Sequence, residues 1–349
     1  MSSQPSPIIT PTPPLPTRLS LAAQVYGIKA IAATVLGATR VFWRSTYNKF
    51  APTYTKRYPI RPMLECRVFI PKSYKTNQKL PLYIDIHGGG FTIGDPQFDD
   101  KVCHYLCNKF GYVVVSLQYR LAPSNPFPIP VDDCTELALA VLSDPDLPVD
   151  HSKVAMGGCS AGGGLTLSVS QDPRLKSKIM ALVPFYPVTD FSYKFTGDFR
   201  DKPAAADGKG AATDGLRNSM HLFDWAYIPY GQDRTDPRLS PIYADAAVFP
   251  KKIYFLTAQY DYLCEEAFNM AKKLAGDNSL TEDADWDVNG VRWERLPDEV
   301  HAFIETAWKT EFFPEAEGEL WKKEIEAVLG RVGAWLDEVF AHNHEPNSG

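Results

Sequence analysis

The sequence Gly158-Cys159-Ser160-Ala161-Gly162 stands between a short apolar run, KVAMGG at 153–158, and a stretch of small residues that favours a helix. It has the form G-x-S-x-G, in which a serine occupies a tight turn from a strand into a helix. A side chain at Gly158 or Gly162 would collide with neighbouring backbone, so the turn requires glycine there. We therefore expect Ser160 to stand above the carboxyl edge of a sheet, where ligands bind in open α/β folds.

A second glycine motif, His87-Gly88-Gly89-Gly90, follows the apolar run at 81–86. Residues without side chains allow backbone N–H groups to approach a substrate oxygen closely. We assign the N–H groups of Gly88, Gly89 and Ala161 to an oxyanion hole, in which each donor contributes roughly 3–4 kcal/mol of transition-state stabilisation. We interpret His87 as a residue that orients this loop rather than as a base.

Two later loops offer an acid and a base. Asp261 follows the strand-like run at 252–258, and His301 follows the run at 291–296. Both loops should open on the same edge of the sheet as Ser160, and the chain order serine, acid, histidine is the order used on this type of sheet. The pattern predicts that His301 accepts the proton of Ser160 and that Asp261 holds the imidazole tautomer.

Other acidic residues and histidines compete for these roles. Asp190 and Asp245 flank an irregular segment, and Asp298 lies close to His301 in sequence. The remaining histidines are less well placed, because they lie on predicted helices or in a polar tail: His104, His221, His342 and His344.

Strand and helix patterns alternate from about residue 80 onward, which predicts an α/β fold with a mostly parallel, twisted sheet flanked by helices. The predicted strands are 81–86, 112–119, 153–158, 178–186, 252–258 and 291–296, and the clearest predicted helices are 98–110, 131–142 and 317–340. Segments 54–60 and 64–70 precede the alternation and should form an antiparallel pair at the sheet edge.

Two segments do not fit the alternation and are predicted to form a cap. These are 1–50, an N-terminal arm with helices, and 190–247, an aromatic-rich insert; the catalytic core is then 51–189 and 248–349. The apolar stretch 19–43 is interrupted by charges, each costing roughly 3 kcal/mol near the centre of a membrane. We therefore expect an amphipathic helix lying on the body of the protein rather than a transmembrane span. A helix that associates with a membrane surface is the remaining alternative.

Composition narrows the class of protein further. The 349 residues carry a net charge of −6, which provides no basic field for nucleic acid. The six cysteines are scattered without a disulfide-like or metal-ligand pattern: Cys66, Cys103, Cys107, Cys134, Cys159 and Cys264. We expect reduced, packed thiols in a cytoplasmic protein, with no metal site.

The motifs together resemble the hormone-sensitive-lipase-like family of esterases. The resemblance rests on HGGGFTIGD (87–95), YRLAPSNPFPIPVDD (119–133), GCSAGGG (158–164) and the Asp261 and His301 loops, over about 80–310. It implies an α/β-hydrolase core, a cap from the N-terminal helices and the insert, and hydrolysis of carboxylic esters without a cofactor. Cys159, Ala302 and Ser124 depart from the residues common at their positions, and Asp85 within a predicted strand has no evident partner.

The expected activity is a serine hydrolase that cleaves small-to-medium apolar esters through an acyl-enzyme. Acyl transfer, lyase or cyclase chemistry, or ligand binding on the same scaffold are the alternatives, because a fold does not fix a function. A homodimer through an edge strand or the cap is compatible with the sequence, although nothing in it requires one.

Overall fold

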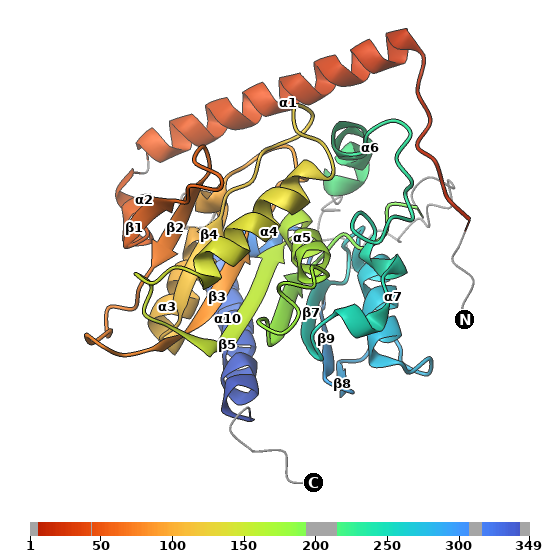
Figure 1. The fold of residues 1–349 in the computed structure, drawn as a ribbon. Helices are drawn as coiled ribbons and strands as arrows, with labels where there is room; N and C mark the ends of the chain where they lie inside the picture. Colours follow the sequence, from red (N-terminus) through yellow and green to blue (C-terminus); the bar gives the residue numbers. More distant parts are fainter. Residues whose placement is uncertain (1–5, 43, 193–214, 307–315, 343–349) are drawn as a thin grey trace.

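The structure is a computed structural model that describes residues 6–42, 44–192, 215–306 and 316–342. Its centre is a nine-stranded sheet in the order β1-β2-β4-β3-β5-β6-β7-β9-β8 (Figure 1). The strands are β1 Tyr54–Arg57, β2 Glu65–Phe69, β3 Leu80–Ile86, β4 Val113–Leu117, β5 Val149–Cys159, β6 Ala181–Phe185, β7 Lys252–Ala258, β8 Trp286–Val288 and β9 Val291–Leu296.

The six strands from β4 to β9 in this order, β4-β3-β5-β6-β7-β9, pair in parallel. The edge strands pair antiparallel, through β1 with β2, β2 with β4, and β8 with β9. The predicted mostly parallel sheet with an antiparallel pair at one edge is therefore confirmed. Because parallel strands end at the same edge, the loops after β3, β5, β7 and β9 open together.

Helices cover both faces of the sheet (Figure 1). Their bounds are α1 Leu15–Phe42, α2 Arg44–Lys49, α3 Asp100–Phe110, α4 Ile129–Leu142, α5 Ala161–Ser170, α6 Gly215–Tyr227, α7 Cys264–Ala275, α8 Phe303–Thr306 and α10 Ala316–Ala341. Residues of α4, α5 and α7 form one buried cluster with the sheet, and residues of α3 and α10 form the cluster on the opposite face.

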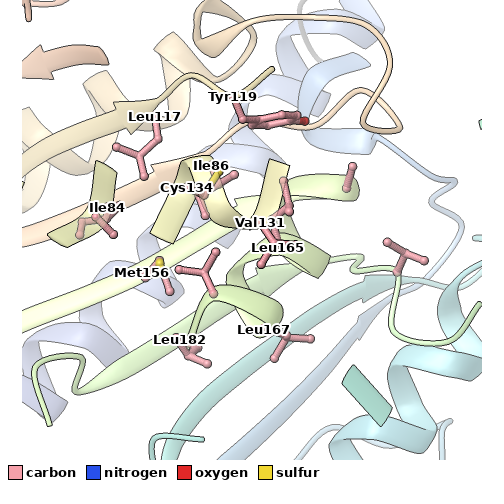
Figure 2. Close-up of a cluster of buried hydrophobic side chains, with 14 of the residues drawn as sticks. Ile84, Ile86, Leu117, Tyr119, Val131, Cys134, Met156, Leu165, Leu167 and Leu182 are labelled. Atoms are coloured by element: carbon pink, nitrogen blue, oxygen red, sulfur yellow. The ribbon is translucent and has the colours of Figure 1, made fainter. Parts of the chain in front are cut away.

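The first of these clusters includes residues of α5, the helix that follows Ser160. Figure 2 shows side chains from β3, β4, β5 and β6 meeting those from α4 and α5. The strand residues are Ile84, Ile86, Leu117, Met156 and Leu182, and the helix residues are Val131, Cys134, Leu165 and Leu167. Strands buried on both faces carry continuous apolar runs, which is why their pattern was readable from the sequence.

Helix α1 forms as predicted and runs along the outside of the molecule (Figure 1). Val25 is its one fully buried residue, and Val35 is 54% exposed. Within the described residues, α1 is also the one helix long and apolar enough to cross a membrane by length and composition alone. In this structure it lies against the body of the protein.

The predicted cap is described in part. α1 packs against α6, and both lie over the carboxyl end of the sheet (Figure 1). Residues 193–214 of the predicted insert, which include the aromatic residues Tyr193, Phe195 and Phe199, lie outside the described residues. The division into a core and a cap therefore remains a prediction.

Candidate active site

Ser160 sits on a sharp turn between β5 and α5. Its backbone has φ +55° and ψ −116°, and its N–H donates to the Phe185 carbonyl at 2.9 Å. A Cβ on Gly158 would lie 2.2 Å from the Ile86 carbonyl oxygen, and a Cβ on Gly162 would lie 1.8 Å from the same atom. Backbone-to-backbone contact on this scale admits no side chain, so the G-x-S-x-G pattern is a steric requirement of the turn.

The structure brings Ser160, His301 and Asp261 together in one hydrogen-bonded chain. Ser160 Oγ lies 2.8 Å from His301 Nε2, and His301 Nδ1 lies 2.9 Å from Asp261 Oδ2. A carboxylate only accepts, so in the neutral imidazole Nδ1 carries the proton and Nε2 accepts from the serine hydroxyl. Asp261 is fully buried, and its other oxygen accepts from the Leu263 N–H at 2.7 Å, which fixes the carboxylate in place.

The competing acids have other local roles. Asp190 accepts from the N–H and hydroxyl of Ser192, and Asp245 caps the short 3-10 helix Ala246–Val248. Asp298 is exposed, and its backbone N–H donates to Gln259 Oε1 at 3.0 Å. The carboxylate that lies at His301 Nδ1 is that of Asp261. Asp261 is thus the acid that reaches His301.

The glycine loop after β3 is held by two aromatic rings. His87 stacks on Tyr119 with 4.2 Å between ring centroids, and His87 Nδ1 lies 2.7 Å from the Gly88 carbonyl oxygen. The Tyr119 hydroxyl donates to the His87 carbonyl at 3.1 Å. Burial raises the pKa of Tyr119 well above its ordinary value, so this hydroxyl keeps its proton and remains a donor.

His87 is fully buried, and desolvation lowers its pKa to about 4. The ring is therefore neutral at pH 7, with the proton on Nδ1 donated to Gly88. Among the described residues, no hydrogen bond is made by the N–H groups of Gly88, Gly89 or Ala161. These three N–H groups are therefore available to a ligand. Tyr119 belongs to the YRLAPSNPFPIPVDD motif, but the sequence did not indicate that it contacts the glycine loop.

A small apolar cavity adjoins Ser160, with about 280 Å³ of empty space. It is lined by residues of the glycine loop, of the segment after β6 and of α6: Gly90, Phe91, Ser160, Ala161, Val188, Phe191, Leu216, Met220, Phe223, Asp224 and Leu263. Phe191 of the aromatic-rich insert lines this cavity, and so do Met220 and Phe223 of α6. The long-range packing of α6 brings Met220 and Phe223 to the cavity, and no local sequence pattern indicates that position.

Phe91 connects the glycine loop to the predicted cap. Its ring stacks on Tyr227 of α6 with 3.7 Å between centroids, and Phe127 meets the same tyrosine edge-on at 6.0 Å. The Phe223 ring on α6 lies so close to Gly90 that a Cβ built on Gly90 would fall 2.6 Å from that ring. Helix α6 thus packs on the glycine loop, and aromatic contacts fix the position of the helix relative to the loop.

Comparison with known proteins places the chain. A family model described as "alpha/beta hydrolase fold" matches residues 83–305, which is more than half of the chain. The chain belongs to the hormone-sensitive-lipase-like family of α/β hydrolases. A carboxylic ester hydrolase, LipN of Mycobacterium tuberculosis, is 31% identical over 207 residues, which are 56% of this chain and 52% of LipN. An arylesterase of Saccharolobus solfataricus is 31% identical over 244 residues, 69% of this chain and 73% of that protein.

Solved structures of the family agree with the fold. An esterase of Pyrobaculum calidifontis has a TM-score of 0.65 and 25% identity, covering 88% of this chain and 92% of that one. The chain spans about half the length of some curated relatives that it matches, including LipN.

The structure shows the surroundings of the three residues that depart from the family pattern. Ala302, where glycine is common, adopts a left-handed φ of +62°, a conformation that favours glycine. Cys159 is buried on the α3 and α10 face of the sheet, away from the cavity beside Ser160. Ser124 is exposed, and the neighbouring Arg120 pairs with Asp133 at 2.7 Å without it.

Asp85 also acquires a partner. The Ser116 hydroxyl donates to Asp85 Oδ2 at 2.6 Å, because the parallel register sets Asp85 of β3 beside Ser116 of β4. The buried carboxylate is thus hydrogen-bonded, as burial of a charge requires.

Proposed function

We propose that this protein is a serine hydrolase that cleaves carboxylic esters of small-to-medium apolar substrates through an acyl-enzyme. The observation that carries the proposal is the hydrogen-bonded chain from Ser160 through His301 to the buried Asp261, opening beside an apolar cavity. A nucleophile, a base and a group that orients the base are the three parts that this chemistry needs.

In the first stage, Ser160 Oγ attacks the ester carbonyl carbon while His301 Nε2 takes the hydroxyl proton. The imidazolium that forms is stabilised by the carboxylate of Asp261. The carbonyl oxygen becomes an oxyanion that accepts hydrogen bonds from the N–H groups of Gly88, Gly89 and Ala161. Ala161 is the first residue of α5, so the positive end of that helix dipole adds to the same stabilisation.

In the second stage, the tetrahedral intermediate collapses and the alcohol leaves with the proton from His301. The acyl group then remains on Ser160 Oγ. His301 next removes a proton from a water molecule, which attacks the acyl carbon, and Ser160 leaves with that proton as the acid is released. Each proton taken up by His301 is returned, so the residue ends neutral.

The cavity supports a substrate with a short apolar group. Its lining is dominated by aliphatic and aromatic side chains, which suit an apolar group next to Ser160. The family membership and the names of the arylesterase and the carboxylic ester hydrolase among the relatives support ester substrates.

The proposal extends to the setting of the enzyme. All six cysteines are buried and none forms a disulfide, which supports a reducing compartment, and we propose the cytoplasm. The negative net charge supports a small-molecule substrate rather than nucleic acid. A homodimer remains a prediction that gel filtration can test.

The test is hydrolysis of p-nitrophenyl esters, from acetate to long chains, by the wild type and Ser160→Ala. We expect turnover of the short esters and a loss of at least about 10⁴-fold in kcat for the variant. Ser170→Ala is the matched control, because Ser170 is a buried serine on α5, the helix that follows Ser160. Its hydroxyl donates to the Leu167 carbonyl, away from the site.

Two results would contradict the proposal. Full turnover by Ser160→Ala would show that another residue is the nucleophile. No turnover of any ester by the folded wild type would favour acyl transfer to another acceptor, lyase chemistry or ligand binding.

A further inference from the structure

The most apolar exposed surface of the molecule is the outward side of α1. Of the large hydrophobic residues that are strongly exposed, most belong to this helix: Leu15, Leu19, Tyr26, Ile31, Val35, Val41 and Phe42, each between 53% and 78% exposed. A soluble protein rarely leaves so many apolar side chains together in water. Figure 1 shows α1 as the outermost helix, at the top of the molecule.

The charged side chains of α1, unlike its exposed apolar ones, contact the body of the protein. The helix has three charged residues, Arg18, Lys29 and Arg40, and all three are engaged on the body of the protein. Lys29 Nζ donates to the carbonyls of Thr92 and Ala122, both at 2.7 Å, and Arg40 pairs with Asp95 at 2.8 Å. Arg18 lies over the Tyr230 ring at 5.3 Å.

A helical wheel makes the segregation clear. At 3.6 residues per turn, the three cations fall within about 40° of one another, whereas the exposed apolar residues extend over about 200° of the circumference. A surface helix of a soluble protein turns its apolar stripe inward and its charges outward. In α1 the cationic anchors contact the protein, and the outward surface is uncharged. That surface carries the apolar residues together with the polar side chains of Ser20, Gln24 and Thr34.

From this arrangement we infer that α1 docks the protein on the surface of a phospholipid bilayer, lying in the plane of the interface. A second protein would contact a stripe of roughly 100° of a straight helix, as in ordinary helix packing. A fluid lipid phase instead surrounds the immersed part of a helix and covers the wider arc. The absence of outward charge on α1 and the net charge of −6 exclude attraction to anionic headgroups as the driving force.

The docking helix is coupled to the active-site edge of the sheet. Thr92 and Asp95, which Lys29 and Arg40 hold, follow directly on the glycine loop at 87–90. A bilayer in contact with α1 would therefore lie near the carboxyl edge of the sheet (Figure 1). The inference concerns binding alone and stands independently of the proposed hydrolysis.

The experiment is flotation of the full chain with vesicles of pure phosphatidylcholine and with vesicles containing phosphatidylserine. We expect the wild type to float with both, without a gain from the anionic lipid. Ile31→Glu, which places a charge at a residue 66% exposed at the middle of α1, should weaken vesicle partitioning at least about tenfold. Met63→Glu is the matched control, because Met63 is 59% exposed but lies outside α1, and it should float like the wild type.

Thermal unfolding of each variant separates docking from folding, and we expect equal midpoints because both side chains are exposed. Three results would overturn the inference. The first is a wild type that does not float. The second is equal flotation of Ile31→Glu and the wild type. The third is a dimer in gel filtration that Ile31→Glu disrupts while vesicles bind neither protein, which would assign the surface to a second copy.

Discussion

At the scale of single residues, distances of a few tenths of an ångström decide which side chains the site accepts. The glycines of the nucleophile turn were readable from the sequence, because the backbone contact that excludes a Cβ at Gly162 recurs wherever such a turn forms. The partner of Asp85 was not readable, since Ser116 reaches it only through the register of β3 with β4. Local steric rules are thus visible in sequence, and cross-strand partners are not.

His87 gives a pH dependence of stability whose sign can be worked out. Burial lowers its pKa in the folded protein to about 4, below the ordinary value of about 6.5. As the pH falls below 6.5, the unfolded chain takes up the proton before the folded protein does. The free energy of unfolding therefore decreases as the pH falls from 6.5 to about 4. Above pH 6.5 and below pH 4 the contribution of His87 no longer changes with pH. The full contribution is about 3 kcal/mol and is present above pH 6.5.

The measurement is denaturant unfolding at pH 7 and pH 4.5 of the wild type and His87→Gln. The variant should lose less stability between the two pH values, by roughly 2 kcal/mol. His151→Gln, which removes an exposed imidazole, is the control and should follow the wild type. An identical pH dependence in His87→Gln would show that His87 is not buried in its neutral form.

At the scale of the elements, long and continuous apolar patterns were predicted well. Strands β7 and β9 have the predicted bounds, and the last helix begins and ends within one residue of its prediction. The short strand β8, Trp286–Val288, was missed, because three residues with intermediate or full exposure carry no distinct period. Its place in the sheet comes from pairing with β9.

The packing of α10 on α3 predicts different outcomes for two neighbouring glycines. A Cβ on Gly333 would lie 2.1 Å from the Phe110 ring, whereas the nearest atom to a Cβ on Gly330 is the Tyr105 hydroxyl at 3.5 Å. Gly333→Ala should lower the free energy of unfolding by about 1–3 kcal/mol, because the Phe110 ring, which packs against the cluster of α3 and α10, must shift. Gly330→Ala should raise it by about 0.5–1 kcal/mol through helix propensity.

Urea unfolding of the two alanine variants beside the wild type checks this pair. Equal effects of the two substitutions would contradict the close approach of α10 to α3.

At the scale of the whole molecule, the packing of the predicted cap could not be predicted from the sequence. The segments 1–50 and 190–247 were assigned to it because they break the strand-helix alternation, which says where a cap begins but not how it packs. The contact of Phe223 with Gly90 joins residues far apart in the chain, and it depends on the placement of the whole of α6. Pocket size therefore follows from tertiary packing rather than from any motif.

This packing predicts how the pocket can be enlarged. Met220 lies on α6, is almost fully buried and lines the cavity beside Ser160. Met220→Ala should move the optimum of the p-nitrophenyl ester series to acyl chains about two carbons longer, because the lost side chain leaves space for them. Asn218→Ala, an exposed position on the same helix, should keep the wild-type optimum. An unchanged optimum in Met220→Ala would place the acyl group elsewhere.

The most direct measurement of the central claim is covalent labelling by a fluorophosphonate, followed by intact mass and peptide mapping. The phosphorus atom takes the place of the ester carbonyl carbon, so the label forms only where a serine is activated. We predict one adduct per chain, on Ser160, and labelling slowed at least about 10³-fold in His301→Gln. A folded wild type that gains no adduct, or that gains one on another residue while Ser160 stays unmodified, would contradict the assignment of Ser160 as the nucleophile.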